Sequence, residues 1–271
     1  MGLRDYYMSA VKGTILSQCP AATIVDITHE IKKFDIIETA FILKNAYRNF
    51  PRNTIHIIAV NNTPHPDPSQ KGGKLEETQP VLAVFADGHY FVGVDDGVFS
   101  IILENKPEKI VAVNLVPDKE LISFPTKDIL VKAACHLAKG GKVELLGKPL
   151  KNFIEKKLLT AYTENNAIRG MIIYMDSFGN AITNITKDLF QIIGQNKNFK
   201  IELKPTLNYS DDLSDGNYTV TTISNSYNDV PEGEIVALFN STGNLEIAIN
   251  KGNAESLLGL KIRDNIRIDF V

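Results

Sequence analysis

Polar residues that could bind a ligand stand at the ends of several predicted strands. They are Asp5, Asp26 to His29, Asn61, Asp95-Asp96-Gly97, Asp176, Asn180 and Asn240-Ser241. Proteins of the α/β class usually place their ligands at such strand ends, but turn-forming and capping residues are common there as well. These residues therefore indicate either a polar ligand site or a set of ordinary turns.

No general motif in the sequence identifies a reaction. There is no Gly-rich phosphate loop, no nucleophile elbow and no pair of histidines at metal-ligand spacing. The two cysteines, Cys19 and Cys135, are far apart in sequence, which favours buried free thiols. We therefore expect no metal site, no disulfide and no bound cofactor.

Composition excludes several kinds of partner. The 271 residues carry a formal net charge of -3 and no basic cluster, which argues against binding to nucleic acid. The longest apolar runs, such as residues 55–60, are too short to cross a membrane, and no signal-peptide pattern is present. The sequence thus predicts a cytoplasmic protein with no nucleic-acid or membrane partner.

The first half of the chain alternates helical and strand patterns. Helices are predicted at residues 4–16, at 36–47 behind an Asp35 cap, and at 126–139. Strands are predicted at 23–27 and 55–60, followed by apolar stretches at 81–86, 90–94, 99–103 and 110–115. The proline-rich residues 61–80 read as a long, mobile loop. This alternation predicts an α/β N-terminal domain at residues 1–155.

The second half has a different pattern. A polar stretch at 156–168 is predicted to be a linker, and residues 169–271 contain short strand patterns separated by turns. Strands are predicted at 171–175, 181–185, 219–223, 235–239, 245–249 and 266–270, with a short helix at 254–258. We therefore predict a smaller, all-β, barrel-like C-terminal domain.

Several motifs, in the same order along nearly the whole chain, resemble one family. They are Gly2 to Tyr7, Ile24 to Glu30 with Phe34-Asp35, Tyr90 to Ser100, Asp176 to Asn180 with Thr183-Asn184, and Asn240 to Asn250 with Gly252 to Ala254. They are similar to the S-adenosylmethionine (SAM) hydrolases, a family that includes fluorinating and chlorinating enzymes. The resemblance implies a homotrimer and a small-molecule ligand, SAM or adenosine, held between the C-terminal domain of one subunit and the N-terminal domain of the next.

The resemblance also implies roles for individual residues. Phe34 and Phe124 match apolar walls of the pocket, and Asp5 matches a carboxylate on the ligand side. Asp176 and Ser241 match groups that hold the methionine ammonium and carboxylate. Further substrate-binding positions are Asn180 for adenine, Tyr227 as the aromatic stacked on the purine, and Phe178 and Asn240 within the matched motifs. Without the resemblance, core packing explains Phe34 and Phe124 equally well, and a turn explains Asp176 and Asn180.

The implied reaction is attack of an anionic nucleophile on the ribose C5′, in line with the sulfonium. Opposite charges merge in this step, so a dry pocket favours it. Hydrolytic members hold water with an Asp, an Arg and a His. Here Asn61 stands in place of the Asp, and Pro125 in place of the His. Lys71 or Lys74 is a loose substitute for the Arg, and His65 is a candidate base, although a histidine between two prolines is more often solvated.

A further difference lies at the start of the chain. Family members begin with a strand that ends in Thr-Asp or Ser-Asp, and that Asp binds both ribose hydroxyls. This chain begins one residue past that Asp, so an interior strand is expected to be missing. A trimmed start is the favoured explanation, and a neighbouring element that fills the gap is the other.

The leading hypothesis is hydrolysis of SAM to adenosine and methionine, with Asn61 and Thr126 as the polar groups that orient water near C5′. The first alternative is a catalytically weak or inactive SAM or adenosine sensor, because the water-holding triad is not intact. The second is a halogenase, since Thr126 stands where halogenases present a serine.

Overall fold

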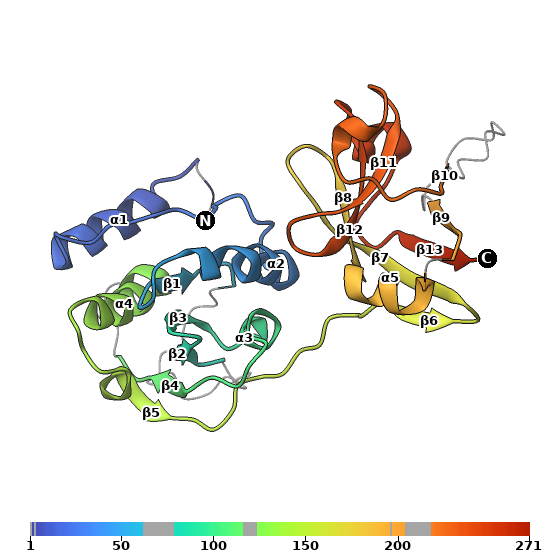
Figure 1. Cartoon of the computed structure of the whole chain (residues 1–271). Helices are drawn as coiled ribbons and strands as arrows, with labels where there is room; N and C mark the ends of the chain where they lie inside the picture. Colours follow the sequence, from blue (N-terminus) through green and yellow to red (C-terminus); the bar gives the residue numbers. More distant parts are fainter. Residues whose placement is uncertain (1, 3, 62–78, 116–123, 196, 204–217) are drawn as a thin grey trace, which may run out of the picture. The chain divides into compact units, whose positions relative to one another are not determined.

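The computed structural model describes residues 2, 4–61, 79–115, 124–195, 197–203 and 218–271. The chain divides into two compact units, Met1–Leu158 and Leu159–Val271, which are drawn in Figure 1. The predicted linker at 156–168 spans the boundary between them. Each unit has its own hydrophobic core, so each is described by itself.

The first unit is built on a five-stranded mixed sheet. Its strands are β1 (Ile55–Ile58), β2 (Val81–Ala86), β3 (His89–Val94), β4 (Lys109–Val113) and β5 (Gly147–Pro149). They lie in the order β1-β3-β2-β4-β5, with β1 and β3 parallel and the other pairs antiparallel. β1 thus lies at an edge, and its carboxyl end and that of β3 lead towards Asn61 and Asp95.

Helices cover both faces of this sheet. The helices are α1 (Tyr7–Gln18), α2 (Ile36–Ala46), α3 (Val98–Ile102) and α4 (Val131–Ala138), with short turns η1 (Tyr47–Asn49), η2 (Thr126–Leu130) and η3 (Val143–Leu146). Alternate strand residues face opposite sides: Leu82 and Val84 pack with α2 and α3, whereas Val81 and Ala83 pack with α4 and η3. α1 packs on α4 through Val11.

Local sequence explains where these helices begin. The Asp35 side chain accepts hydrogen bonds from the backbone N–H groups of Ile37 and Glu38, which confirms the predicted cap of α2. The predicted helix at 126–139 is present as the π-helical turn η2 followed directly by α4. The apolar stretch at 99–103 forms most of α3 rather than a strand.

The predicted strand at 23–27 is wrong. These residues form no strand, and Val25 is 59 % exposed. The segment runs alongside α1 (Figure 1). The Lys12 ammonium of α1 pairs with the Asp26 carboxylate of this segment. A β-strand needs a neighbouring strand for its backbone hydrogen bonds, and among the described residues none lies beside this segment.

The second unit is an antiparallel sheet that is nearly closed into a barrel. Its strands are β6 (Tyr162–Glu164), β7 (Ala167–Met175), β8 (Ala181–Thr186), β9 (Phe199–Leu203), β10 (Tyr218–Val220), β11 (Ile235–Phe239), β12 (Asn244–Ile249) and β13 (Asn265–Phe270). They follow the order β10-β9-β13-β7-β8-β12-β11, with β6 paired to β7. A bridge from Ser224, just after β10, to Leu238 of β11 joins the two ends of this order.

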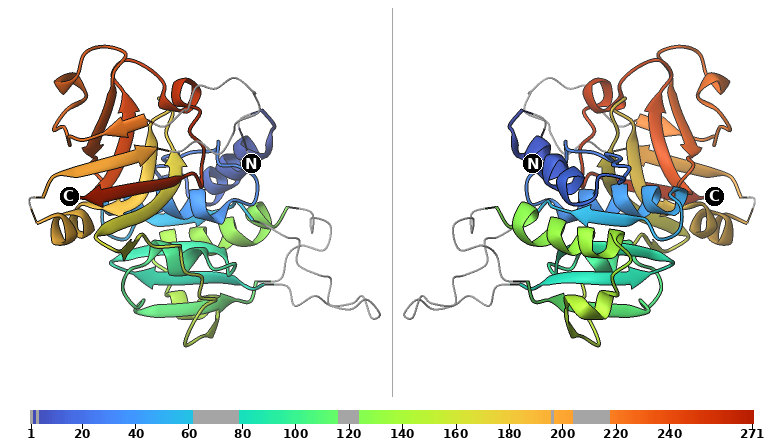
Figure 2. Two further views of the ribbon diagram at one scale, coloured as in Figure 1. Left: turned by 90° about the vertical axis from the view of Figure 1, so that its right-hand side faces the viewer. Right: turned by 90° about the vertical axis from the view of Figure 1, so that its left-hand side faces the viewer.

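Most predicted strands of this unit are confirmed, and α6 (Ala254–Leu258) coincides with the predicted helix. The strand expected at 219–223 ends at Val220. β9 and α5 (Lys187–Gly194) were not predicted, although Thr186 caps α5 by accepting from the Leu189 N–H. Phe190 of α5 packs against Phe270 of β13, and both views of Figure 2 show α5 beside the C-terminus.

Two histidines are buried together in the first unit. His56 of β1 and His89 of β3 are 5 % and 4 % exposed, and His56 Nε2 lies 3.3 Å from His89 Nδ1. Burial, followed by the charge on His89, lowers the pKa of His56 to about 4. Burial also lowers the pKa of His89. Both imidazoles are therefore neutral in the folded protein at pH 7.

We expect acid to destabilise the first unit through His56. The pKa of His56 is lower in the folded than in the unfolded state. The contribution of this residue to the free energy of unfolding is therefore fully present above about pH 6.5 and is lost as the pH drops towards 4. The expected loss is about 2 kcal/mol. Urea unfolding between pH 7.5 and 4.5 measures it. The free energy of unfolding should depend less on pH in His56→Leu, and its dependence on pH should persist in the control His136→Gln. An unchanged pH dependence in His56→Leu would contradict the role given to His56.

Along the described part of the chain, no helix is long and apolar enough to cross a membrane.

Candidate functional site

A buried carboxylate organises the polar residues of the second unit. Glu246 of β12 is 2 % exposed and accepts hydrogen bonds through both oxygens. The Tyr227 hydroxyl donates to Oε1 at 2.7 Å, and the Asn240 amide donates to Oε2 at 2.9 Å. Burial, and next the hydrogen bond to Glu246, raise the pKa of Tyr227 above its ordinary value. Two residues predicted separately, Tyr227 and Asn240, are thus held by one carboxylate.

Sequence reasoning missed Glu246. A signal was present, because Leu245-Glu-Ile-Ala-Ile249 places one acidic residue inside a run of apolar strand residues. A charge in a buried strand is unfavourable unless hydrogen bonds compensate it, so such a residue usually has a specific partner. Its partners come from η4 (Tyr227–Asp229) and from the end of β11, which the sequence did not bring together.

Asp176 and Asn180 form the turn between β7 and β8. Asp176 Oδ1 accepts the backbone N–H groups of Phe178 and Asn180, both at 2.9 Å, and Oδ2 accepts the Asn180 amide at 3.1 Å. A carboxylate can accept about four hydrogen bonds, so about one position remains for a ligand. The turn interpretation is therefore correct for both residues, and it leaves room for ligand binding as well.

The same turn presents an aromatic ring. Phe178 is 74 % exposed, and Tyr227 is 41 % exposed. The charge of Asp176 contributes to the raised pKa of Tyr227, so these two side chains are within electrostatic reach. Gly179 adopts a left-handed φ of 78°, and a Cβ there would lie 2.2 Å from Asn253 Nδ2, so the turn requires glycine. Ser241 is exposed at the end of β11.

In the first unit, Asn61 is held by an acidic residue. The Asn61 amide nitrogen donates to Asp96 Oδ2 at 3.1 Å, and Asp96 Oδ1 accepts the Val98 N–H at 3.0 Å. Asp96 is 4 % exposed. Because β1 and β3 are parallel neighbours, their carboxyl ends bring Asn61 and Asp96 together. With Nδ2 bound to Asp96, the Oδ1 of Asn61 is left to accept a hydrogen bond from water.

The adjacent Asp95 has a structural partner. It is 5 % exposed, and its Oδ1 accepts the Ile154 N–H at 2.9 Å. Burial raises the pKa of this carboxyl. Asp95 thus anchors the end of the first unit, whereas Asp96 contacts the predicted site residue.

Thr126 and Phe124 belong to the start of the η2–α4 helix. Thr126 is 2 % exposed and lies in the π-helical turn, a rare geometry that is frequent at functional sites. Phe124 contacts Tyr7 edge-on, with ring centroids 5.2 Å apart, and packs beside Val131. For Phe124 the core-packing interpretation is therefore at least partly correct. Pro125 precedes the turn with φ of -56°, a value that suits a helix start.

Phe34 has a strained backbone and an exposed ring. Its φ is 65°, in the left-handed region, and its side chain is 67 % exposed. A bulky residue in this region costs about 1–2 kcal/mol, so packing within the unit does not explain Phe34. Asp5 is also exposed. His65, Lys71 and Lys74, named as possible replacements for the triad, lie outside the described residues.

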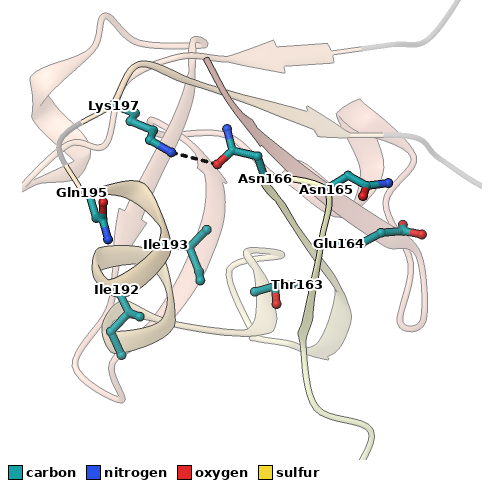
Figure 3. Close-up of a pocket in the computed structure, with 8 residues that line it drawn as sticks. All are labelled: Thr163, Glu164, Asn165, Asn166, Ile192, Ile193, Gln195 and Lys197. Carbon is teal, nitrogen blue, oxygen red and sulfur yellow. Dashed lines mark hydrogen bonds between the residues drawn. The ribbon is translucent and has the colours of Figure 1, made fainter.

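A separate pocket of about 330 Å³ lies elsewhere in the second unit (Figure 3). Its eight lining residues are Thr163, Glu164, Asn165, Asn166, Ile192, Ile193, Gln195 and Lys197. Lys197 Nζ donates to Asn166 Oδ1 at 2.9 Å, and Glu164 pairs with Arg169. Its charged groups are therefore already paired, and none of the predicted site residues lines it.

The described residues define a class of protein. An α/β unit is followed by a nearly closed antiparallel barrel, and the barrel presents aromatic rings beside carboxylates that suit a ligand with a flat ring and a cation. The chain belongs to the SAM hydroxide adenosyltransferase family. Its N-terminal domain matches residues 1–147, and its C-terminal domain matches residues 170–267.

Named relatives match over nearly the full length. An (R)-S-adenosyl-L-methionine hydrolase from Thermus thermophilus is 27 % identical, over 96 % of this chain and 93 % of the relative. A hydrolase of the same name from Methanocaldococcus jannaschii is 25 % identical over 99 % and 93 %. A fluorinase from Nocardia brasiliensis is 24 % identical over 99 % and 94 %.

Solved structures show the same fold. A conserved protein from Thermotoga maritima superposes with a TM-score of 0.81 at 25 % identity, covering 99 % of this chain and 97 % of that one. A conserved protein from Thermus thermophilus gives a TM-score of 0.69 at 28 % identity, covering 98 % and 95 %.

Proposed function

We propose that this protein binds SAM and hydrolyses it at the ribose C5′ to adenosine and methionine. The observation that carries this proposal is the match to both domains of the family, in order, together with hydrolases that align over nearly the whole chain. The arrangement of side chains in each unit supplies the physical support.

The second unit contributes recognition of the ligand. The remaining acceptor position on Asp176 suits the methionine ammonium, because a charge-assisted hydrogen bond is stronger than a neutral one. The exposed rings of Tyr227 and Phe178 suit the flat adenine, since stacking adds about 0.5–1.5 kcal/mol beyond the buried area. Asn180 and Ser241 offer the polar contacts expected for adenine and for the methionine carboxylate.

The first unit contributes orientation of water. In the proposed step, the oxygen of a water molecule accepts a hydrogen bond from the buried Thr126 hydroxyl, or a water O–H donates one to Asn61 Oδ1, and the water oxygen attacks C5′ opposite the sulfonium. The C5′–O bond forms while the C5′–S bond breaks, and the electron pair leaves with sulfur as neutral methionine. The water proton is released to solvent. Asp96 acts as a positioning residue, because its hydrogen bond fixes the Asn61 amide.

Phe34 provides a test of the pocket wall. We expect Phe34→Gly to lower the affinity for SAM about tenfold through loss of aromatic contact area. The free energy of unfolding should stay unchanged or rise by about 1 kcal/mol, because glycine relieves the left-handed backbone. Calorimetric titration and urea unfolding measure the two effects. Asn53→Gly, at another left-handed residue with φ of 67°, is the control and should leave affinity unchanged. Lower stability with unchanged affinity would assign Phe34 to packing.

The activity is tested by incubating the protein with SAM, with and without chloride or fluoride, and separating the products by chromatography. Adenosine and methionine in equal amounts, above the protein-free rate, are expected. Tight binding without turnover would favour the sensor. That alternative is supported by the resemblance, which implies Asn61 and Pro125 in place of an Asp and a His. A 5′-halo-adenosine would favour the halogenase.

The homotrimer and the cytoplasmic location stay predictions. Light scattering of the purified protein tests the first, with a mass near three times 30.0 kDa as the expected result.

A further inference from the structure

The two cysteines of the chain, 116 residues apart in sequence, are in contact in the first unit. The Cys19 thiol donates to the Cys135 backbone carbonyl, with the sulfur 3.7 Å from the oxygen. Both side chains pack in one apolar cluster that includes Val11 of α1 and Val131 of α4. Both are free thiols. Distance along the sequence therefore does not separate these two thiols in the folded chain.

Each cysteine is held at the C-terminal end of a helix. The Cys19 N–H donates to the Ile15 carbonyl at 2.7 Å and caps α1, and Pro20 restricts Cys19 to an extended backbone. In α4, the Cys135 carbonyl also accepts the Lys139 N–H at 3.1 Å. The two side chains thus face one another without rearrangement of either helix, as a disulfide requires.

The two thiols have different surroundings. Cys135 is 2 % exposed, whereas Cys19 is only partly buried. Burial, and next a side-chain hydrogen bond with Cys19, raise the pKa of Cys135 to about 11. Because a thiol must be accessible and ionised to attack an oxidant, an oxidant in solution should react with Cys19 first. Cys135 is then the thiol in place to react with the modified Cys19, an arrangement found in redox-sensing cysteine pairs.

We infer that Cys19 and Cys135 form a reversible oxidation site, which a small disulfide such as oxidised glutathione converts from two thiols into one disulfide. The Cys19 thiolate attacks one sulfur of the glutathione disulfide, and the other sulfur leaves as a thiolate. Cys135 then loses its proton to solvent and attacks Cys19 Sγ, and the second glutathione leaves. Two protein thiols are oxidised, and one glutathione disulfide is reduced to two thiols.

The bond joins the end of α1 to α4 and closes a long loop of the chain. A cross-link of this kind restricts the unfolded chain, and the restriction grows with the length of the loop. Oxidation should therefore stabilise the folded protein. In a reducing compartment such a pair stays reduced until the oxidant rises, so it suits a reversible response better than a permanent bond.

The test uses the full chain and oxidised glutathione. The folded protein is incubated with glutathione disulfide, desalted, and alkylated with iodoacetamide in urea. Intact mass spectrometry should show the loss of two hydrogen atoms, with neither glutathione nor an alkyl group attached, and dithiothreitol should restore two thiols that react. The Tm of the oxidised protein should be about 5–10 °C higher than that of the reduced protein.

Two single variants test the order of attack, and a thermal melt shows that each is folded. Cys135→Ala should keep one glutathione on Cys19 with no rise in Tm, and Cys19→Ala should stay unmodified because Cys135 is buried.

Four results would overturn the inference. They are a natural protein that keeps one glutathione, one in which neither thiol reacts, a disulfide between two chains, and glutathione on Cys135 in Cys19→Ala. None of these measurements uses SAM, so a failed oxidation site and a failed hydrolase are distinguished directly.

Discussion

Exchanging Asn61 and Asp96 in the double variant Asn61→Asp/Asp96→Asn is expected to raise kcat for SAM hydrolysis about tenfold to a hundredfold. The exchange keeps the hydrogen bond of 3.1 Å but reverses its direction, so a carboxylate takes the place of the amide at residue 61. A carboxylate there can accept the proton of the attacking water, which an amide cannot. The amide introduced at position 96 would still accept the Val98 N–H through its own Oδ1.

The single variants are the controls for this exchange. Asp96→Asn should lower kcat about tenfold with little change in KM, because the Asn61 amide loses a charge-assisted partner. Asn61→Asp alone should gain little at neutral pH, because two carboxylates about 3 Å apart cannot both ionise easily. A pH profile of kcat separates these cases. A double variant no faster than the natural protein would sink the proposed role of Asn61 at C5′.

Replacing Glu246 by alanine is expected to weaken SAM binding about a hundredfold. The substitution removes the acceptor of both the Tyr227 hydroxyl and the Asn240 amide, and truncating one partner of a buried, hydrogen-bonded charge costs about 2–5 kcal/mol. Tyr227 would then lose its fixed orientation for stacking. Calorimetric titration measures the affinity, and a thermal melt shows whether the variant is folded at the titration temperature.

Two further variants separate binding from stability. Glu232→Ala removes an exposed carboxylate that pairs with Lys251, and should leave the affinity unchanged. Glu246→Gln keeps one acceptor oxygen and should recover part of the affinity. If Glu246→Ala is folded and binds SAM as the natural protein does, Glu246 has a structural role only.

Much of the fold was predictable because local patterns determine it. The apolar runs of β2, β3, β11 and β12 and the Asp35 cap of α2 require no knowledge of the rest of the chain. Residues 23–27 show the limit of such patterns. Their apolar residues favour a strand, but a strand also needs a partner, and among the described residues the position beside them is a cavity.

For the candidate site as well, some features follow from the sequence and others only from the structure. The sequence by itself determined residue types, namely the family motifs and the Asp-Asn turn at 176–180. The resemblance predicted that Asn61 and Pro125 stand in place of two residues of the water-holding triad. Only the tertiary structure decided which residues act together. Asn61 and Asp96 meet because β1 and β3 are parallel neighbours, and Tyr227 meets Asn240 because Glu246 lies between them in a buried strand. A hydrogen bond between residues distant in sequence depends on strand pairing, which local sequence does not encode.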